Sequence, residues 1–260
     1  MDQPRPDDDF TGEPCYGEGV PYASPPSRRR KHLIVVAASL AALLAGAVVV
    51  DRMAAARAES RTAEAFQDGM GTAERPSVHV GGFPVLTQLA GGSLRHVDLT
   101  ARDIPADDTT RPLPVTKLTV GLDGLKTSGG AEEAHARSVD ATAFLSYEDL
   151  SDALGVTVSQ GDGSGRVNAT ADLPVIGEVT MSTAVAAASG NRIAFTGIRA
   201  VQGDLLPPLK AVVDEALAEP LPLRNIPEGL RLRSVTTTES GIEARFTGRS
   251  VTFRPGSSSA

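Results

Sequence analysis

The residues that could carry acid–base or metal chemistry are few and scattered in this sequence. Of its four histidines, His79, His96 and His135 follow the first 50 residues, and each lacks a second His or Cys at the spacing of metal ligands. His79 and His96 fall in segments with strand periodicity, where a histidine is ordinarily exposed or hydrogen-bonded. They predict no metal site and no catalytic base.

The patterns that resemble nucleophile or phosphate sites lack the context that this chemistry needs. The stretch 161–165 (GDGSG) has the wrong order for a nucleophile elbow and lacks the strand-to-helix context of a phosphate loop. The carboxylate pairs Asp107-Asp108 and Glu132-Glu133 lie in loops rich in Pro, Gly and Thr, where solvated charge is the ordinary interpretation. We therefore expect no catalytic residue, no metal, no cofactor and no enzyme activity.

The composition argues against nucleic-acid recognition. The 260 residues carry a formal net charge of −7, whereas neutralising phosphates needs clustered Lys and Arg. Tryptophan is absent and aromatic residues make up only 4% of the chain, which disfavours stacking platforms for bases or sugars. The sole cysteine, Cys15, lies near the N-terminus, so the rest of the chain is stabilised by packing without disulfides.

The elements that must position any binding site begin with a membrane segment. Residues 33–50 (LIVVAASLAALLAGAVVV) are uncharged and long enough to span a bilayer, and the basic run 28–31 places the preceding end in the cytoplasm. A cleaved signal peptide ending near 45–47 is the alternative, but the long preceding tail and long apolar core favour an uncleaved anchor. Residues 1–32 are then a disordered cytoplasmic tail with a basic flank, and the remaining chain lies outside the cytoplasm.

A helix is predicted to follow the anchor directly. Residues 51–70 are rich in alanine and charge, and Gly69 and Gly71 are stop signals for a juxtamembrane helix within 51–75. Either it is a plain stalk, or it packs on the sheet through Phe66 and Met70; we favour packing. Its thin apolar stripe consists of Met53, Ala56, Ala63, Phe66 and Met70.

From residue 76 to 254 the apolar residues alternate with polar ones at a period of two, which is typical of half-buried strands. No strand–helix–strand rhythm appears, so we expect an antiparallel sheet with turns at 162–165, Gly190-Asn191 and Ser240-Gly241. Residues 255–260 are expected to be a disordered tail. The alternating apolar positions are Val78 and Val80; Leu118, Val120 and Leu122; Val139, Ala141, Ala143 and Leu145; Val179, Met181 and Val185; Ile193 and Phe195; Leu230 and Leu232; Ile242, Ala244 and Phe246; Val251 and Phe253.

Two helices are predicted to interrupt the strands. One begins at Ser146, with Asp149 three residues on as in a capping box, and ends at Gly155. The other spans 204–219, with Asp204 as N-cap. Packing of its aliphatic stripe on the sheet is the ordinary interpretation, and lining a ligand groove is a variant of it. The stripe comprises Leu205, Leu206, Leu209, Val212, Val213, Ala216 and Leu217.

The segment 78–94 (VHVGGFPVLTQLAGGSL) is unusual for a soluble domain. Two Gly-Gly pairs permit sharp bends, and Pro84 prevents regular ladder pairing between them. The apolar cluster 83–86 in such a bend is either a core plug or an exposed lip that meets lipid. The residues alone leave both open.

This segment resembles the hallmark of the LmeA-like phospholipid-binding proteins of actinobacterial envelopes. The residues that carry the resemblance cover roughly 52–254 and include Val78, Val80, the string 82–89 (GFPVLTQL), Gly92, Val97, Leu99, Asp103-Ile104, Leu223, Ile226-Pro227, Gly229-Leu230, Val235, Gly241-Ile242, Gly248, Val251 and Phe253. The resemblance implies a strongly curved antiparallel β-sheet wrapped around helix, an α+β fold similar to tubular lipid-binding domains, here with an N-terminal transmembrane helix.

The resemblance also implies a function. It is that of an extracytoplasmic protein that binds phospholipid, phosphatidylinositol species among them, and supports lipoglycan maturation in the cell envelope; together with the predicted anchor this gives a single-pass membrane protein. The family offers no catalytic residues to carry over. A non-catalytic envelope scaffold with a solid core is the competing hypothesis, which the absence of an apolar pocket would favour. The expected lipid-binding residues are Phe83 and Pro84 at the lip, and Leu86, Leu89, Leu206, Leu209 and Val213 lining the groove.

Overall fold

The structure is a computed structural model that describes residues 28–106, 113–127, 133–173, 177–202, 219–223 and 226–253. The chain divides into two compact units, Met1–Gly46 and Ala47–Ala260. The described part of the first unit is a stretch of helix α1, and the strands introduced below belong to the second unit.

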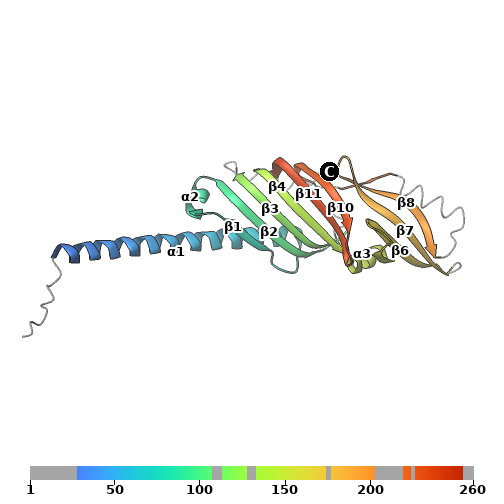
Figure 1. The fold of residues 1–260 in the computed structure, drawn as a ribbon, viewed down its shortest axis with the longest axis horizontal. Coiled ribbons are helices and arrows are strands. Elements are labelled where there is room, and N and C mark those ends of the chain that lie inside the picture. Colours follow the sequence, from blue (N-terminus) through green and yellow to red (C-terminus); the bar gives the residue numbers. More distant parts are fainter. Residues whose placement is uncertain are drawn as a thin grey trace, which may run out of the picture. The chain divides into compact units, whose positions relative to one another are not determined.

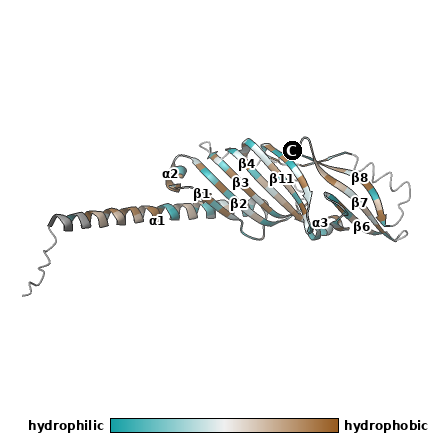
Figure 2. Ribbon diagram, in the orientation of Figure 1, coloured by the Kyte–Doolittle hydropathy of each residue, from teal (hydrophilic) through white to brown (hydrophobic). Residues whose placement is uncertain are grey.

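Helix α1 (Arg28–Met70) joins the predicted membrane segment and the predicted helix after it into one continuous helix, blue in Figure 1. It ends where Gly71 adopts a left-handed φ of 64° and donates its N–H to the carbonyl of Gln67 at 2.9 Å. From Val35 onward α1 is long and apolar enough to cross a membrane, by length and composition. The apolar side chains from Val35 to Val50 are exposed, not packed in a core, and hydrophobic colour gathers there in Figure 2. A membrane anchor is compatible with this segment, and so is a signal sequence.

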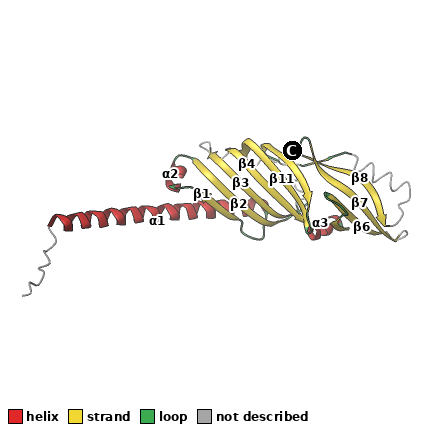
Figure 3. Cartoon of the chain, in the orientation of Figure 1, coloured by secondary structure: helices red, strands yellow, loops and turns green. Residues whose placement is uncertain are grey.

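Six strands form the larger sheet, in which every neighbouring pair is antiparallel. The sheet curls into a half-barrel, seen in yellow in Figure 3. The predicted antiparallel α+β fold with a curved sheet is confirmed. In spatial order the strands are β1 (Ser77–Gly81), β2 (Ser93–Ile104), β3 (Val115–Thr127), β4 (Ala134–Ser146), β11 (Gly241–Phe253) and β10 (Glu228–Thr237).

The register of this sheet gathers the predicted alternating residues on one face. Successive strand pairs align a single apolar row across the whole sheet: Val78, Leu99, Val120, Ala141, Phe246 and Leu232. The next residue along each strand belongs to the opposite face, where the aligned row is largely polar: His79, Asp98, Gly121, Asp140, Thr247 and Arg231. We call the side that carries the first row the apolar face. Period-two alternation in each strand is what allows the paired strands to build it.

A second, smaller antiparallel sheet packs against one end of the first. The sequence predicts antiparallel strands but does not divide them between two sheets, because alternation identifies the buried face of a strand but not its partner. Its strands and α3 share a core cluster with β10 and β11. In spatial order its strands are β5 (Thr157–Gln160), β6 (Arg166–Leu173), β7 (Gly177–Ala188), β8 (Arg192–Gln202) and β9 (Leu221–Pro222).

Helix α3 (Tyr147–Leu154) has the predicted caps. The Ser146 hydroxyl accepts the N–H of Asp149 at 3.0 Å, and Gly155 ends the helix with a left-handed φ of 66°. In a capping box the Asp149 carboxylate would accept the N–H of Ser146 directly, but here Thr116 lies between the two groups. The Thr116 hydroxyl accepts that N–H at 2.8 Å and donates to the Asp149 carboxylate. A residue of β3 therefore completes the capping box.

The second half of α1 packs on the sheet, as we expected. Ala55 and Ala63 are buried, and Phe66 is partly buried against the cluster formed by residues of β2. Packing through Phe66 is confirmed. Alanine occurs on every side of this helix, so composition alone does not predict which face is buried. Met70, the second residue through which packing is expected, is 36% exposed and lies outside that cluster, so packing through Met70 is not confirmed. The stripe residues Met53 (68% exposed) and Ala56 are exposed as well.

Some predictions fall outside the described residues. They are the tail with Cys15, most of the helix at 204–219 with Leu206, Leu209 and Val213, and the C-terminal tail. Among the described residues, the second half of α1 is the long helix that packs on the larger sheet, and the short helices α2 and α3 pack on it as well.

Candidate functional site

The string 82–89 forms a tight loop followed by a short helix, α2 (Val85–Ala90), which the sequence analysis does not predict. Gly82 has a φ of 92°, and a Cβ there would lie 2.9 Å from Nε2 of Gln88, so both its conformation and its surroundings require glycine. Pro84 takes the N-cap position in extended conformation, where a missing N–H removes no helical hydrogen bond.

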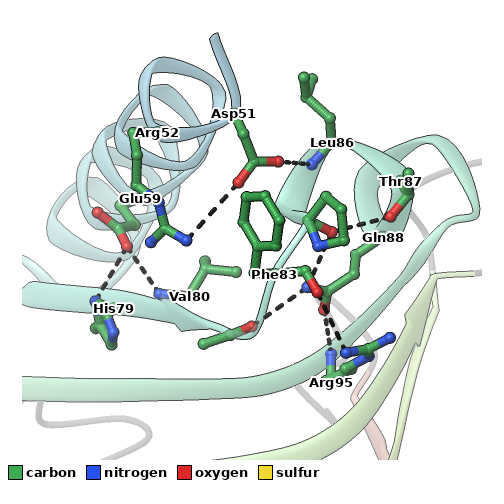
Figure 4. Close-up of polar contacts among 12 residues, drawn as sticks. Asp51, Arg52, Glu59, His79, Val80, Phe83, Leu86, Thr87, Gln88 and Arg95 are labelled. Carbon is green, nitrogen blue, oxygen red and sulfur yellow. Dashed lines mark hydrogen bonds and ion pairs between the residues drawn. The ribbon is translucent and has the colours of Figure 1, made fainter. Parts of the chain in front are cut away.

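The side chain of Gln88 holds this loop against the sheet. Its Nε2 donates to the carbonyls of Gly81 and Pro84 at 3.4 and 3.3 Å, and its Oε1 accepts the N–H of Arg95 in β2 at 2.8 Å (Figure 4). Only 7% of Gln88 is exposed, and a buried amide needs such partners. The glutamine of the string is therefore a structural residue that links β1, α2 and β2.

Some apolar residues of the string 82–89 lie in the core and others form an exposed lip, the two roles that the sequence left open. Val85 is completely buried in a cluster with Ala55 of α1, so this residue is the core plug. Phe83, Leu86 and Leu89 are 50%, 40% and 39% exposed. We call these three exposed residues the α2 lip.

Asp51 of α1 also holds α2 in place, through a hydrogen bond to its backbone. Its Oδ1 accepts the N–H of Leu86 at 2.8 Å, although its side chain is only 2% exposed (Figure 4). Among the described residues its Oδ2 has no hydrogen-bond partner, and the guanidinium of Arg52 lies 3.8 Å away as an ion-pair contact. The same guanidinium stands 5.8 Å from the centre of the Phe83 ring, within cation–π range.

Helix α1 also covers the open edge of the sheet. β1 is an edge strand, and Oε1 of Glu59 accepts the N–H of Val80 at 2.8 Å while lying 3.3 Å from Nδ1 of His79. One turn further, Arg75 donates to Glu64 at 2.7 Å. Unpaired edge N–H groups invite pairing with other chains, and α1 satisfies one of them.

The apolar face offers a second surface suited to lipid. None of the 13 residues of β3, a central strand, is fully buried, and Leu118, Val120 and Leu122 on its apolar side are all partly exposed. A central strand covered on that side by a close-packed core would have fully buried residues there. One hollow of about 420 Å³ lies elsewhere, along α1, lined by Ala56, Arg57, Ser60, Arg61 and Glu64. Its charged lining does not suit acyl chains.

On the polar face, His96 bridges two carboxylates. Its Nδ1 lies 2.7 Å from Asp123 and its Nε2 lies 3.0 Å from Asp98, and Ser138 donates to Asp123 at 3.2 Å. The hydrogen bond to Asp123 raises the pKa of His96, against a smaller opposing effect of burial. The same bond lowers the pKa of Asp123. Among the described residues no group of three or more His, Cys, Asp or Glu side chains could hold a metal ion.

The family comparison adds to this geometry. A family model described as LmeA-like phospholipid-binding matches residues 49–247. The chain belongs to the LmeA-like phospholipid-binding family. The resemblance noted in the sequence is thereby confirmed, and the family is one of binding proteins, not catalysts. No curated protein and no solved structure matches the chain significantly.

The LmeA-like match begins just before Asp51, so it includes the half of α1 that carries Asp51 and Glu59. Neither acid stands out in the sequence as more than helix surface. Of the expected lipid-binding residues, the structure brings Phe83, Pro84, Leu86 and Leu89 together around α2; the other three, Leu206, Leu209 and Val213, lie outside the described residues.

Proposed function

We propose that this LmeA-like protein binds phospholipid outside the cytoplasm while α1 anchors it in the membrane. The observation that carries the proposal is the apolar row that crosses all six strands of the larger sheet and stays partly exposed in β3. Membership of a phospholipid-binding family supports a lipid as the ligand of this surface.

Binding would be mainly hydrophobic. Burial of acyl chain contributes about 0.8 kcal/mol per methylene, so two chains supply ample affinity without special polar residues. We further propose that residues of the α2 lip, with Pro84 beside them, receive the lipid at the membrane. Leu206, Leu209 and Val213 are proposed to line its path.

The finer role follows from the family resemblance. We propose that the N-terminus is cytoplasmic and that the domain supports lipid or lipoglycan maturation in an actinobacterial envelope, with a phosphatidylinositol-type lipid as one candidate ligand. The basic run at 28–31 before the apolar segment supports this orientation.

Photo-crosslinking would test the proposal on the full-length chain. The protein would be reconstituted in vesicles containing a phospholipid with a photoactivatable group on its acyl chain, and labelled peptides identified by mass spectrometry. We expect labels on the apolar side of β3 and β4 as well as on residues 33–50.

A pair of neighbouring substitutions provides the matched control. Val120→Trp fills space on the apolar face and should reduce labelling of β4, whereas Thr119→Trp on the opposite side of the same strand should not. Circular dichroism would check that both variants fold. Labels confined to residues 33–50 would contradict lipid binding by the sheet and favour the envelope scaffold with a solid core.

A further inference from the structure

The α2 lip is an exposed apolar surface that the described residues leave uncovered. Phe83, Leu86 and Leu89 each expose at least 39% of their surface. Val85 between them is fully buried, so the orientation of α2 is held firmly while Leu86 and Leu89 of α2 and the preceding Phe83 stay outside. A contiguous apolar group on a fixed element marks an interaction surface.

The position of the α2 lip along α1 indicates what covers it. Asp51, whose carboxylate accepts the N–H of Leu86, is the first charged residue after the apolar run that ends at Val50. A helix rises 1.5 Å per residue, so Asp51 lies only about 1.5 Å beyond the last apolar residue. Residues 47–50 and α2 belong to the same compact unit. If the apolar run occupies a bilayer, the α2 lip stands where α1 leaves it.

The charges around the α2 lip fit the same location. The guanidinium of Arg52 stands over the Phe83 ring at 5.8 Å, and Nη1 of Arg95 donates to the Phe83 carbonyl at 3.4 Å. Aromatic and aliphatic side chains flanked by arginine are typical of segments that lie at the boundary between lipid headgroups and acyl chains. Each guanidinium can pair with a lipid phosphate while the apolar residues enter the boundary.

We propose that the α2 lip docks on the surface of the bilayer that holds α1. Phe83, Leu86 and Leu89 insert at the headgroup boundary, Arg52 and Arg95 face the phosphates, and Asp51 fixes α2 at that depth. The inference rests on the proposed function, since it requires α1 to be anchored in the membrane. It adds that the domain contacts the membrane directly, next to its anchor.

The absence of tryptophan from the chain allows a direct test with a single reporter. Phe83→Trp would place the only indole of the full-length protein on the α2 lip, and Val201→Trp, at an exposed apolar position of β8, is the matched control. Both variants would be reconstituted in vesicles with phospholipids brominated near the top of the acyl chain. We expect the indole of the Phe83→Trp variant to emit at shorter wavelength than that of the control and to lose intensity with brominated lipid. The indole of the Val201→Trp control should keep its intensity.

Other outcomes would overturn the inference. If the indole at position 83 emits at the wavelength of an indole in water, the α2 lip is uncovered. If its emission is blue-shifted but not quenched by brominated lipid, the α2 lip is covered by protein, for example by a second copy of the chain. In the Phe83→Trp background, Asp51→Ala should weaken the quenching, whereas Glu64→Ala on the same helix should not. Unchanged quenching in Asp51→Ala would exclude Asp51 as the positioning residue.

This result is independent of the crosslinking experiment. Labels on β3 together with an unquenched indole at position 83 would overturn the docking inference alone. Quenching of that indole without labels on β3 would support docking and contradict the proposed function.

Discussion

At the scale of single residues, the string 82–89 combines residues that hold the fold with the exposed apolar residues of the α2 lip. A Cβ at Gly82 would displace the Gln88 amide that holds the loop, and Val85 is completely buried in the core. Phe83 and Leu86 remain outside. Substitutions within the string should therefore separate into those that unfold the domain and those that change its contact with lipid.

His96 predicts a defined dependence of stability on pH. Its pKa is raised above the ordinary value of 6.5, so its contribution is fully present below pH 6.5 and is lost as pH rises through the raised folded-state pKa. The pKa of Asp123 is lowered from 3.8, so its contribution is present above pH 3.8 and is lost as pH falls through its folded-state pKa. Both contributions are in place between these two ordinary values.

The measurement is the thermal unfolding midpoint of the wild type and of His96→Gln as a function of pH. We expect the midpoints to differ most between pH 3.8 and 6.5 and to converge at higher pH. Asp123→Asn should remove most of the same pH dependence, because it deletes the partner of the stronger hydrogen bond. A constant difference at every pH would contradict the assigned roles.

At the scale of elements, one hairpin joins the two sheets. Asn191, in the predicted β7–β8 turn, has a left-handed φ of 56°. Its Nδ2 donates to the carbonyl of Leu230 at 3.0 Å and its Oδ1 accepts the N–H of Leu232 at 2.8 Å. Because β10 is the edge strand of the larger sheet, this amide satisfies the edge as a neighbouring strand would.

Replacing Asn191 would weaken this junction. Asn191→Gly keeps the left-handed backbone accessible but deletes both hydrogen bonds, and we expect a loss of about 1–3 kcal/mol in the free energy of unfolding. Asn191→Asp can still accept from Leu232 but cannot donate to Leu230. Chemical denaturation would measure both, with Ser189→Gly in the same loop as control. Wild-type stability in Asn191→Gly would show that the Asn191 hydrogen bonds contribute nothing to the junction between the sheets.

At the scale of the whole molecule, α1 continues from the basic flank to the sheet without a break. With a retained anchor, we expect Cys15, the sole cysteine, to lie in the cytoplasm, because the basic run precedes the apolar segment. An impermeant thiol reagent applied to intact cells should then leave Cys15 unlabelled, because the membrane separates the two.

The matched control moves the cysteine to the domain that we propose lies outside the cytoplasm. In a Cys15→Ser background, Ser189→Cys in the exposed β7–β8 turn should react with the same reagent. Labelling of Cys15 in intact cells would show that the N-terminus lies outside the cytoplasm, opposite to the expected orientation. A mature N-terminus near Ala47 would show that the segment is a cleaved signal peptide.

The sequence by itself determined the features that depend on near neighbours in the chain. Alternation such as Leu118, Val120 and Leu122 selects the apolar side of a strand, because successive side chains point to opposite faces. Ser146 and Gly155 mark the ends of α3 through contacts within one helical turn. Membership of the phospholipid-binding family likewise follows from residues 49–247 without any coordinates.

Only the tertiary structure decided which strands pair, which face of α1 is buried and where the α2 lip lies. Asp51 and Leu86 are 35 residues apart in the chain, and the bond between them makes a helix-surface acid into a buried anchor for α2. Likewise Asn191 reaches β10 from the other sheet. Contacts of this kind depend on the three-dimensional path of the chain, since long-range neighbours leave no periodic pattern in residue types.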